Sequence, residues 1–343
     1  MYLERIGEDR RLKSVDGLRT LAFLIVVLCH FGGMIGSGFP KGSVARIVCE
    51  ALGRSGSVGT DTFFFLAAFL LCRSLRRGVN WKEAMGRRLL KFYPGLLAML
   101  TLYVLLSTLM PSVAKLPKDG VDAVIYVVAN LLLLPGIVPM TPIITIAWSL
   151  SYVVAGYVLV GGLFRLTASH WQRCLVWAGA AVLIWSADQF AEFPHGRLLF
   201  FPLGALFAEM MPRISRIGSW WWLVALAGLS AAFFWPGLST RAIGIGLLVT
   251  GALAAPEIQS RTLNALIATL GRNSYAVFLS HGIALHLIQL ADPVRETLTD
   301  LFALVFAGMS LVLVVALVFR TLVLDPLRGV SLQLPVGDRI PAR

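Results

Sequence analysis

Two ionisable residues, Arg19 and His30, lie at opposite ends of the first long apolar run of the sequence. They are 11 residues apart. An α-helix turns about 100° and rises about 1.5 Å per residue, so both side chains would share one face, about 16 Å apart along the axis. The guanidinium suits a phosphate-bearing molecule, and the imidazole suits proton transfer. Alternatively, Arg19 extends to a membrane surface and His30 only hydrogen-bonds a neighbouring helix.

A basic stretch follows the second apolar run. Between residues 73 and 91 it has seven cationic side chains and one acidic side chain, Glu83. Guanidinium groups bind phosphate oxygens in a bidentate manner, so this stretch predicts contacts with a phosphate-bearing molecule. The candidates for those contacts are Arg73, Arg76, Arg88 and Lys91. Retention of positive charge on the cytoplasmic side, or contact with anionic lipid headgroups, is the alternative for each residue.

Other polar residues lie within or beside apolar runs. Asp61 begins the second run at a depth similar to that of His30, where its carboxylate would orient the imidazole or accept a hydrogen bond from a substrate hydroxyl. A helix N-cap is the alternative role for Asp61. A further set would contact the substrate, namely Trp148, Ser149, Ser151 and His281. For the serines and for His281, hydrogen bonds that only support the helix packing are the alternative.

The composition excludes a soluble enzyme. Of the 343 residues, 57% are apolar and 14% are charged, whereas soluble domains carry about 25% charged residues. The four cysteines have no C-x-x-C spacing, so neither a disulfide framework nor a metal site is expected. We therefore expect a membrane protein, in which a net charge of +12 is explained by topology and not by nucleic-acid binding.

Apolar runs near 20 residues predict ten membrane-spanning helices. They cover residues 18–36, 59–73, 89–110, 143–164, 173–190, 197–211, 218–236, 241–256, 272–290 and 301–324. The segment 121–138 is interrupted by Asn130, Pro135 and Pro139, and we interpret it as a partly inserted element. Ten spans leave 22 of the 30 Lys and Arg residues on the side of the N-terminus, which predicts two cytoplasmic termini. The predicted fold is thus one all-α domain over residues 1–343, a polytopic helix bundle.

Five short motifs occur in order between residue 14 and about residue 290. They are Asp16-Gly17-Leu18-Arg19 with His30, the Gly59–Leu66 segment, the Arg87–Pro94 segment, Trp148-Ser149-Leu150-Ser151 and the Gly271–His281 segment. In this order they resemble the motifs of the acyltransferase-3 family of membrane acyltransferases, whose first helix has Arg or Lys, ten residues and then His. The sequence departs from the family after Ser151, where Tyr152-Val153-Val154 replaces a stretch with two glutamates. No role of those glutamates transfers to this chain.

The resemblance implies O-acyl transfer from acyl-CoA, with acetyl-CoA as the expected donor, to a hydroxyl of a surface polysaccharide, a lipid-linked glycan or a glycolipid. Acyl-CoA would be a co-substrate, without a permanently bound cofactor. Its phosphates would bind Arg19 and the basic stretch from the cytoplasm, and a neutral His30 would act as general base. Membrane lipid is the expected environment, in the cytoplasmic membrane of a bacterium. The alternative is a secondary transporter or exporter of a glycan precursor, with no acyl transfer.

Overall fold

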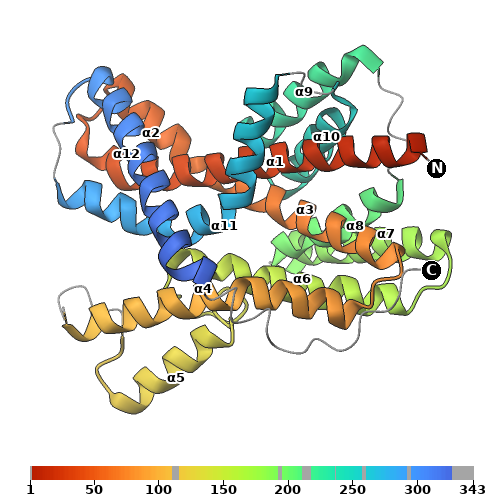
Figure 1. Cartoon of the computed structure of the whole chain (residues 1–343), viewed down its shortest axis with the longest axis horizontal. Coiled ribbons are helices and arrows are strands. Elements are labelled where there is room, and N and C mark those ends of the chain that lie inside the picture. The colour runs from red at the N-terminus through yellow and green to blue at the C-terminus, as the bar shows by residue number, and fades with distance from the viewer. Residues whose placement is uncertain are drawn as a thin grey trace.

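The computed structural model describes residues 2–109, 116–191, 195–210, 218–235, 237–256, 260–291 and 295–326. Over these residues the chain is all-helical, as predicted, and Figure 1 shows the arrangement. The α-helices are α1 (Tyr2–Ile35), α2 (Val44–Arg54), α3 (Gly56–Arg76), α4 (Trp81–Leu109), α5 (Gly120–Leu131), α6 (Trp148–Arg165), α7 (His170–Ala191), α8 (Phe200–Met210), α9 (Trp221–Phe234), α10 (Leu238–Ala254), α11 (Arg261–Leu290) and α12 (Leu298–Phe319).

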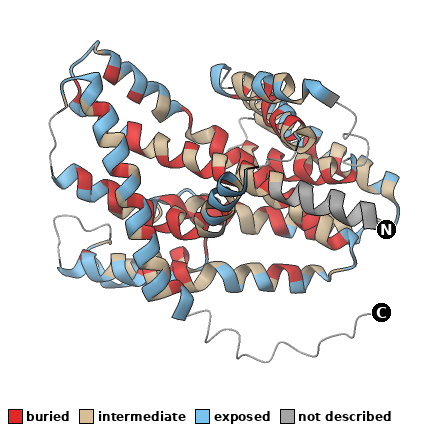
Figure 2. Ribbon diagram, turned by 45° about the horizontal axis from the view of Figure 1, so that its top comes forward, coloured by how far each residue is buried: buried red, intermediate tan, exposed pale blue. Residues whose placement is uncertain are grey.

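Five helical segments in the described ranges are long and apolar enough to cross a membrane. They are Ser14–Gly38, Val44–Arg76, Trp81–Leu109, Thr145–Arg165 and Leu298–Leu324. Buried residues gather where the helices meet, and exposed residues cover the outer faces (Figure 2). Each of the ten predicted spans overlaps a separate helix. The number of membrane crossings and the side of each terminus stay predictions.

One helix was not predicted from the sequence, and the interrupted segment is only partly helical. The amphipathic helix α2 was not predicted, because at 11 residues it is too short to register as a span. Within the segment 121–138, helix α5 ends at Leu131 and the chain then turns. Asn130 holds that turn, since its side chain donates to the carbonyl of Tyr126 and accepts from the backbone N–H of Ile143 at 2.8 Å.

Helix α1 packs between α3 and α11 (Figure 1). It carries Arg19 and His30. The helix α3 runs antiparallel to α1, because Gly59 lies against Ala22 and Val26 whereas Gly56 lies against Cys29. A Cβ at Gly59 would meet the backbone of Ala22, so glycine allows the close approach. On the other side, the hydroxyl of Thr20 donates to the carbonyl of Ile267 in α11 at 3.4 Å.

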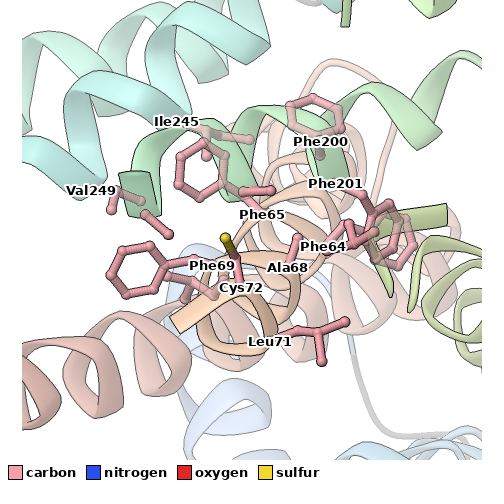
Figure 3. Packing of buried hydrophobic residues seen from close by; sticks show 14 of the residues in the cluster. Phe64, Phe65, Ala68, Phe69, Leu71, Cys72, Phe200, Phe201, Ile245 and Val249 are labelled. Atoms are coloured by element: carbon pink, nitrogen blue, oxygen red, sulfur yellow. The ribbon is translucent and has the colours of Figure 1, made fainter. Parts of the chain in front are cut away.

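The largest part of the core lies where α3 meets α8 and α10. Figure 3 shows three aromatic rings of α3, Phe64, Phe65 and Phe69, in the same cluster as side chains of α8 and α10. The ring of Phe64 stacks on Phe201 of α8 with centroids 5.2 Å apart. Because lipid is as apolar as these side chains, close packing is what holds the helices together. This packing sets the position of Asp61, one turn before Phe64 and Phe65.

Candidate active site

His30 lies beside His281 of α11. Their ring centroids are 5.2 Å apart and their planes are tilted by 39°. His281 is buried, with 1% of its surface exposed, and its Nδ1 lies 2.8 Å from the carbonyl oxygen of Phe278 and 3.1 Å from that of Val277. The predicted general base and one predicted substrate-binding residue are therefore neighbours. Imidazole pairs of this kind can move a proton.

Asp61 does not contact His30 among the residues that the structure describes. Its carboxylate is fully buried and pairs with Arg241, 3.0 Å from Oδ2, and with Arg197, 3.7 Å from Oδ1. Gly59 faces α1, and Asp61, two residues later, points about 200° away around α3. The geometry therefore contradicts the predicted use of Asp61 to orient the imidazole.

Asp61 instead supports a polar cavity, here called the arginine pocket. The cavity has a volume of about 460 Å³ and is lined by Gly136, Trp148, Tyr152, Asp188, Gly196, Arg197, Leu238 and Arg241. The guanidinium of Arg197 lies over the ring of Trp148, 5.1 Å from its centroid. The pocket thus combines guanidinium donors, a carboxylate acceptor and aromatic faces. Of these residues, the sequence analysis had selected Trp148 alone.

Arg88 contacts Tyr157 of α6 at the other end of the site, in the core cluster that also holds Val15 and Leu18 next to Arg19. Arg88 donates a hydrogen bond to the Tyr157 hydroxyl, and its guanidinium lies 4.8 Å from the centroid of the Tyr157 ring. Arg19 lies 3.6 Å from the Asp16 carboxylate on its own helix. Two of the predicted phosphate contacts therefore lie at the same end of α1. This Arg19–Arg88 cluster and the His30–His281 pair lie at the two ends of one face of α1.

The comparison with protein families decides the class of this protein. The sequence model of the acyltransferase-3 family, described as an acyltransferase domain, matches residues 12–321. The chain belongs to the acyltransferase-3 family. The resemblance that the five motifs predicted is therefore confirmed, and the protein is a membrane acyltransferase. No curated protein and no solved structure matches the chain.

The basic stretch of this acyltransferase does not converge on one site. Arg76 donates to the carbonyl of Ala208 at 2.7 Å and lies 3.6 Å from the buried carboxylate of Glu209 in α8. Glu209 also pairs with Arg173 at 2.7 Å and with His170 at 2.8 Å. Arg76 is therefore used in packing α3 against α8. Its predicted role in binding the donor is not supported by this geometry.

Arg73 lies in the last turn of α3, whereas Lys91 lies on α4, three residues after Arg88. The guanidinium of Arg73 lies 5.7 Å from the ring centroid of Phe69 on its own helix, and Lys91 is exposed on α4. The chain connects α3 to α4 between these residues, so their side chains leave two different helices. Contact of Arg73 and of Lys91 with the donor stays a prediction.

A second cavity of the acyltransferase lies at the start of α4, two helical turns before Arg88, and we call it the Trp81 pocket. It has a volume of about 450 Å³ and is lined by Leu75, Val79, Asn80, Trp81, Lys82, Phe164, Arg165 and Thr167. On α6, residues four apart share a face, which aligns Tyr157 with Gly161 and Arg165. Gly161 lies against the Trp81 ring. The Trp81 pocket is therefore the continuation of the Arg19–Arg88 cluster along α6.

The two serines of the Trp-Ser-Leu-Ser motif do not line the arginine pocket. The hydroxyl of Ser149 donates to the carbonyl of Ile146 at 3.0 Å, within its own turn. Ser151 is buried, and its hydroxyl has no hydrogen-bond partner among the described residues. Ser149 is thus explained by local structure. Contact of Ser151 with the substrate stays a prediction.

Proposed function

We propose that this acyltransferase moves an acyl group, with acetyl as the expected case, from acyl-CoA to a hydroxyl of a carbohydrate. The carbohydrate would be a surface polysaccharide or a lipid-linked glycan on the outer side of a bacterial cytoplasmic membrane. One observation carries the proposal: a cation that suits phosphate and an imidazole that suits proton transfer lie on one face of α1, in a chain of the acyltransferase-3 family. The two groups match the two ends of an acyl-CoA.

The donor would bind at the end with Arg19 and Arg88. Coenzyme A carries an adenine ring, a 3′-phosphate and a pyrophosphate. In the Trp81 pocket, Lys82 and Arg165 are available to phosphate oxygens and the Trp81 ring to the adenine. The pantetheine arm would then pass along α1 and bring the thioester to His30, about 16 Å further along the axis.

At His30 the reaction needs one base and no cofactor. The imidazole accepts the proton of the acceptor hydroxyl while the hydroxyl oxygen forms a bond to the thioester carbonyl carbon. The carbon–sulfur bond then breaks, and the proton passes from His30 to the sulfur of coenzyme A. The products are the O-acylated carbohydrate and free coenzyme A, with His30 neutral again.

The arginine pocket would hold the part of the acceptor that does not react. Sugar hydroxyls can accept hydrogen bonds from Arg197 and Arg241 and donate to the carboxylate of Asp188. The charges in the pocket nearly balance, because the carboxylates of Asp61 and Asp188 face two guanidinium groups. This balance favours a neutral, hydroxyl-rich ligand. Binding of remote parts of a substrate supplies the energy that orients the reacting group.

The full-length chain in lipid nanodiscs tests the proposal. Radiolabelled acetyl-CoA is supplied with surface polysaccharide extracted from cells that lack the gene, and label in the polysaccharide is counted. We expect transfer by the wild type and a loss of about 10²–10⁴-fold in His30→Gln, with acetyl-CoA binding retained. His286→Gln, an exposed histidine of α11, is the control and should keep full activity.

Two outcomes would contradict the proposal. Near-normal turnover by folded His30→Gln would exclude the general base. Absence of acylated polysaccharide with the wild type, together with identical glycan mass spectra from cells with and without the gene, would exclude the carbohydrate acceptor.

A further inference from the structure

The hydrogen bonds of His281 determine which of its nitrogens carries the proton. Its Nδ1 faces two backbone carbonyl oxygens, those of Val277 and Phe278. A carbonyl oxygen only accepts hydrogen bonds, so Nδ1 must be the protonated nitrogen and Nε2 must carry a lone pair in the neutral ring. The backbone of α11 thus holds His281 in one tautomer, with a hydrogen-bond acceptor at the far side of the ring.

That acceptor is buried and has no hydrogen-bond partner among the described residues. A buried polar atom without a partner destabilises a protein unless another group uses it. If His281 served only in packing, its Nδ1 hydrogen bond would be satisfied, but the unpaired Nε2 would destabilise the folded state with no compensating interaction. Among the described residues, two aromatic rings contact that of His281, those of His30 and Phe278, and of these only the His30 ring has nitrogen atoms.

The spacing of the two rings suits a hydrogen bond between them. An in-line N–H···N bond of about 3.0 Å places the centroids of two imidazoles about 5.2 Å apart, and the observed separation is 5.2 Å. The ring planes are tilted by 39°, and no hydrogen bond joins the two rings in this structure. The second torsion of a histidine side chain has a broad energy minimum, and His30 is only half-buried, so rotation of the His30 ring can align them.

We propose that His281 is the positioning residue for His30. Its Nε2 accepts the ring N–H of His30, so that the other nitrogen of His30 is free to act as the base. This inference rests on the proposed function of His30. A neutral imidazole would then do what the carboxylate does in a Ser-His-Asp triad, because Arg197 and Arg241 already hold Asp61.

The proton balance of this arrangement is simple. The acceptor hydroxyl gives its proton to the free nitrogen of His30, which becomes an imidazolium. The hydrogen bond to Nε2 of His281 stabilises that charge, and no charge moves to the backbone. When the proton passes to the sulfur of coenzyme A, His30 returns to the neutral tautomer that His281 selects.

Three variants test this role by kinetics. His281→Gln places an amide oxygen near the position of Nε2, whereas His281→Leu has no acceptor; His286→Leu is the control. Loss of a hydrogen bond to a charged group should lower the kcat of His281→Leu about 10–100-fold. The KM values for acetyl-CoA and polysaccharide should change less than about threefold, and His281→Gln should recover most of the loss. Equal kcat in all three variants, or a raised KM with unchanged kcat, would overturn the proposal.

A measurement without activity separates this inference from the proposed function. In ¹⁵N-histidine-labelled protein, His281 should show a protonated Nδ1 and an unprotonated Nε2, identified by their loss in His281→Gln. The ¹⁵N signals of His30 should move in His281→Leu and stay in place in His286→Leu. A neutral His281 ring protonated at Nε2 would refute the pairing even if acyl transfer is observed. Unchanged ¹⁵N signals of His30 in His281→Leu would also refute it. If acyl transfer is absent, these signals still report whether the pair exists.

Discussion

At the scale of single residues, Arg88 and Arg76 have different partners although both belong to the basic stretch. Arg88 contacts the ring and the hydroxyl of Tyr157, next to the Trp81 pocket. We predict that Arg88→Ala raises the Kd for acetyl-CoA about tenfold or more, because a charge-assisted hydrogen bond contributes about 1.5–3 kcal/mol. Isothermal titration of the protein in nanodiscs measures this. Arg87→Ala is the matched control, since Arg87 pairs with Glu83 on the exposed side of the same helix.

Arg76 should affect stability instead. We predict that Arg76→Ala lowers the midpoint of thermal unfolding by a few degrees and changes the Kd for acetyl-CoA less than about threefold. Glu209 keeps Arg173 and His170 as partners, so the loss of the partly exposed Arg76 costs about 1 kcal/mol. A large loss of acetyl-CoA affinity in an Arg76→Ala protein of normal stability would show that Arg76 binds the donor, and it would contradict this prediction.

At the scale of helices, close packing depends on glycines whose neighbours are backbone atoms. A Cβ at Gly244 of α10 would meet the backbone of Gly228 and Ala232 in α9, whereas a Cβ at Gly246 would meet nothing. We predict that Gly244→Ala lowers the unfolding midpoint, because overpacking of a tight contact costs about 1–3 kcal/mol. Gly246→Ala on the same helix should leave it unchanged. Equal midpoints for the two variants would show that α9 and α10 are not packed this closely.

At the scale of the whole molecule, the prediction concerns topology. Reporter fusions at residues 80, 120, 168 and 343 should give inside, outside, inside and inside, because 22 of the 30 basic residues lie on the side of the N-terminus in the ten-span arrangement. Among the predicted spans, α8 is the one to check, because its helix has 11 residues and covers only about 16 Å of a hydrocarbon core about 30 Å thick. An outside result at residue 343 would mean that an odd number of segments crosses.

The sequence by itself determined the class of the protein and the alignment of Arg19 with His30. Both depend on local quantities: apolar content decides the solvent, and helix periodicity decides which residues of one helix share a face. The five ordered motifs led to the family for the same reason, because each is a short continuous segment. His281, Asp61, Trp148 and Arg88 were also selected in this way.

Only the tertiary structure decided which of these residues act together. Asp61 pairs with Arg241, 180 residues away, and His281 replaces Asp61 beside His30. The choice depends on the direction in which each side chain leaves its helix and on which neighbour packs there. Gly59 packs against α1, so the helix period places Asp61 on the opposite side of α3. Helix α11 packs along α1 and brings His281 beside His30. Contacts between distant segments follow from the packing of whole helices, which the spacing of residues along one helix does not determine.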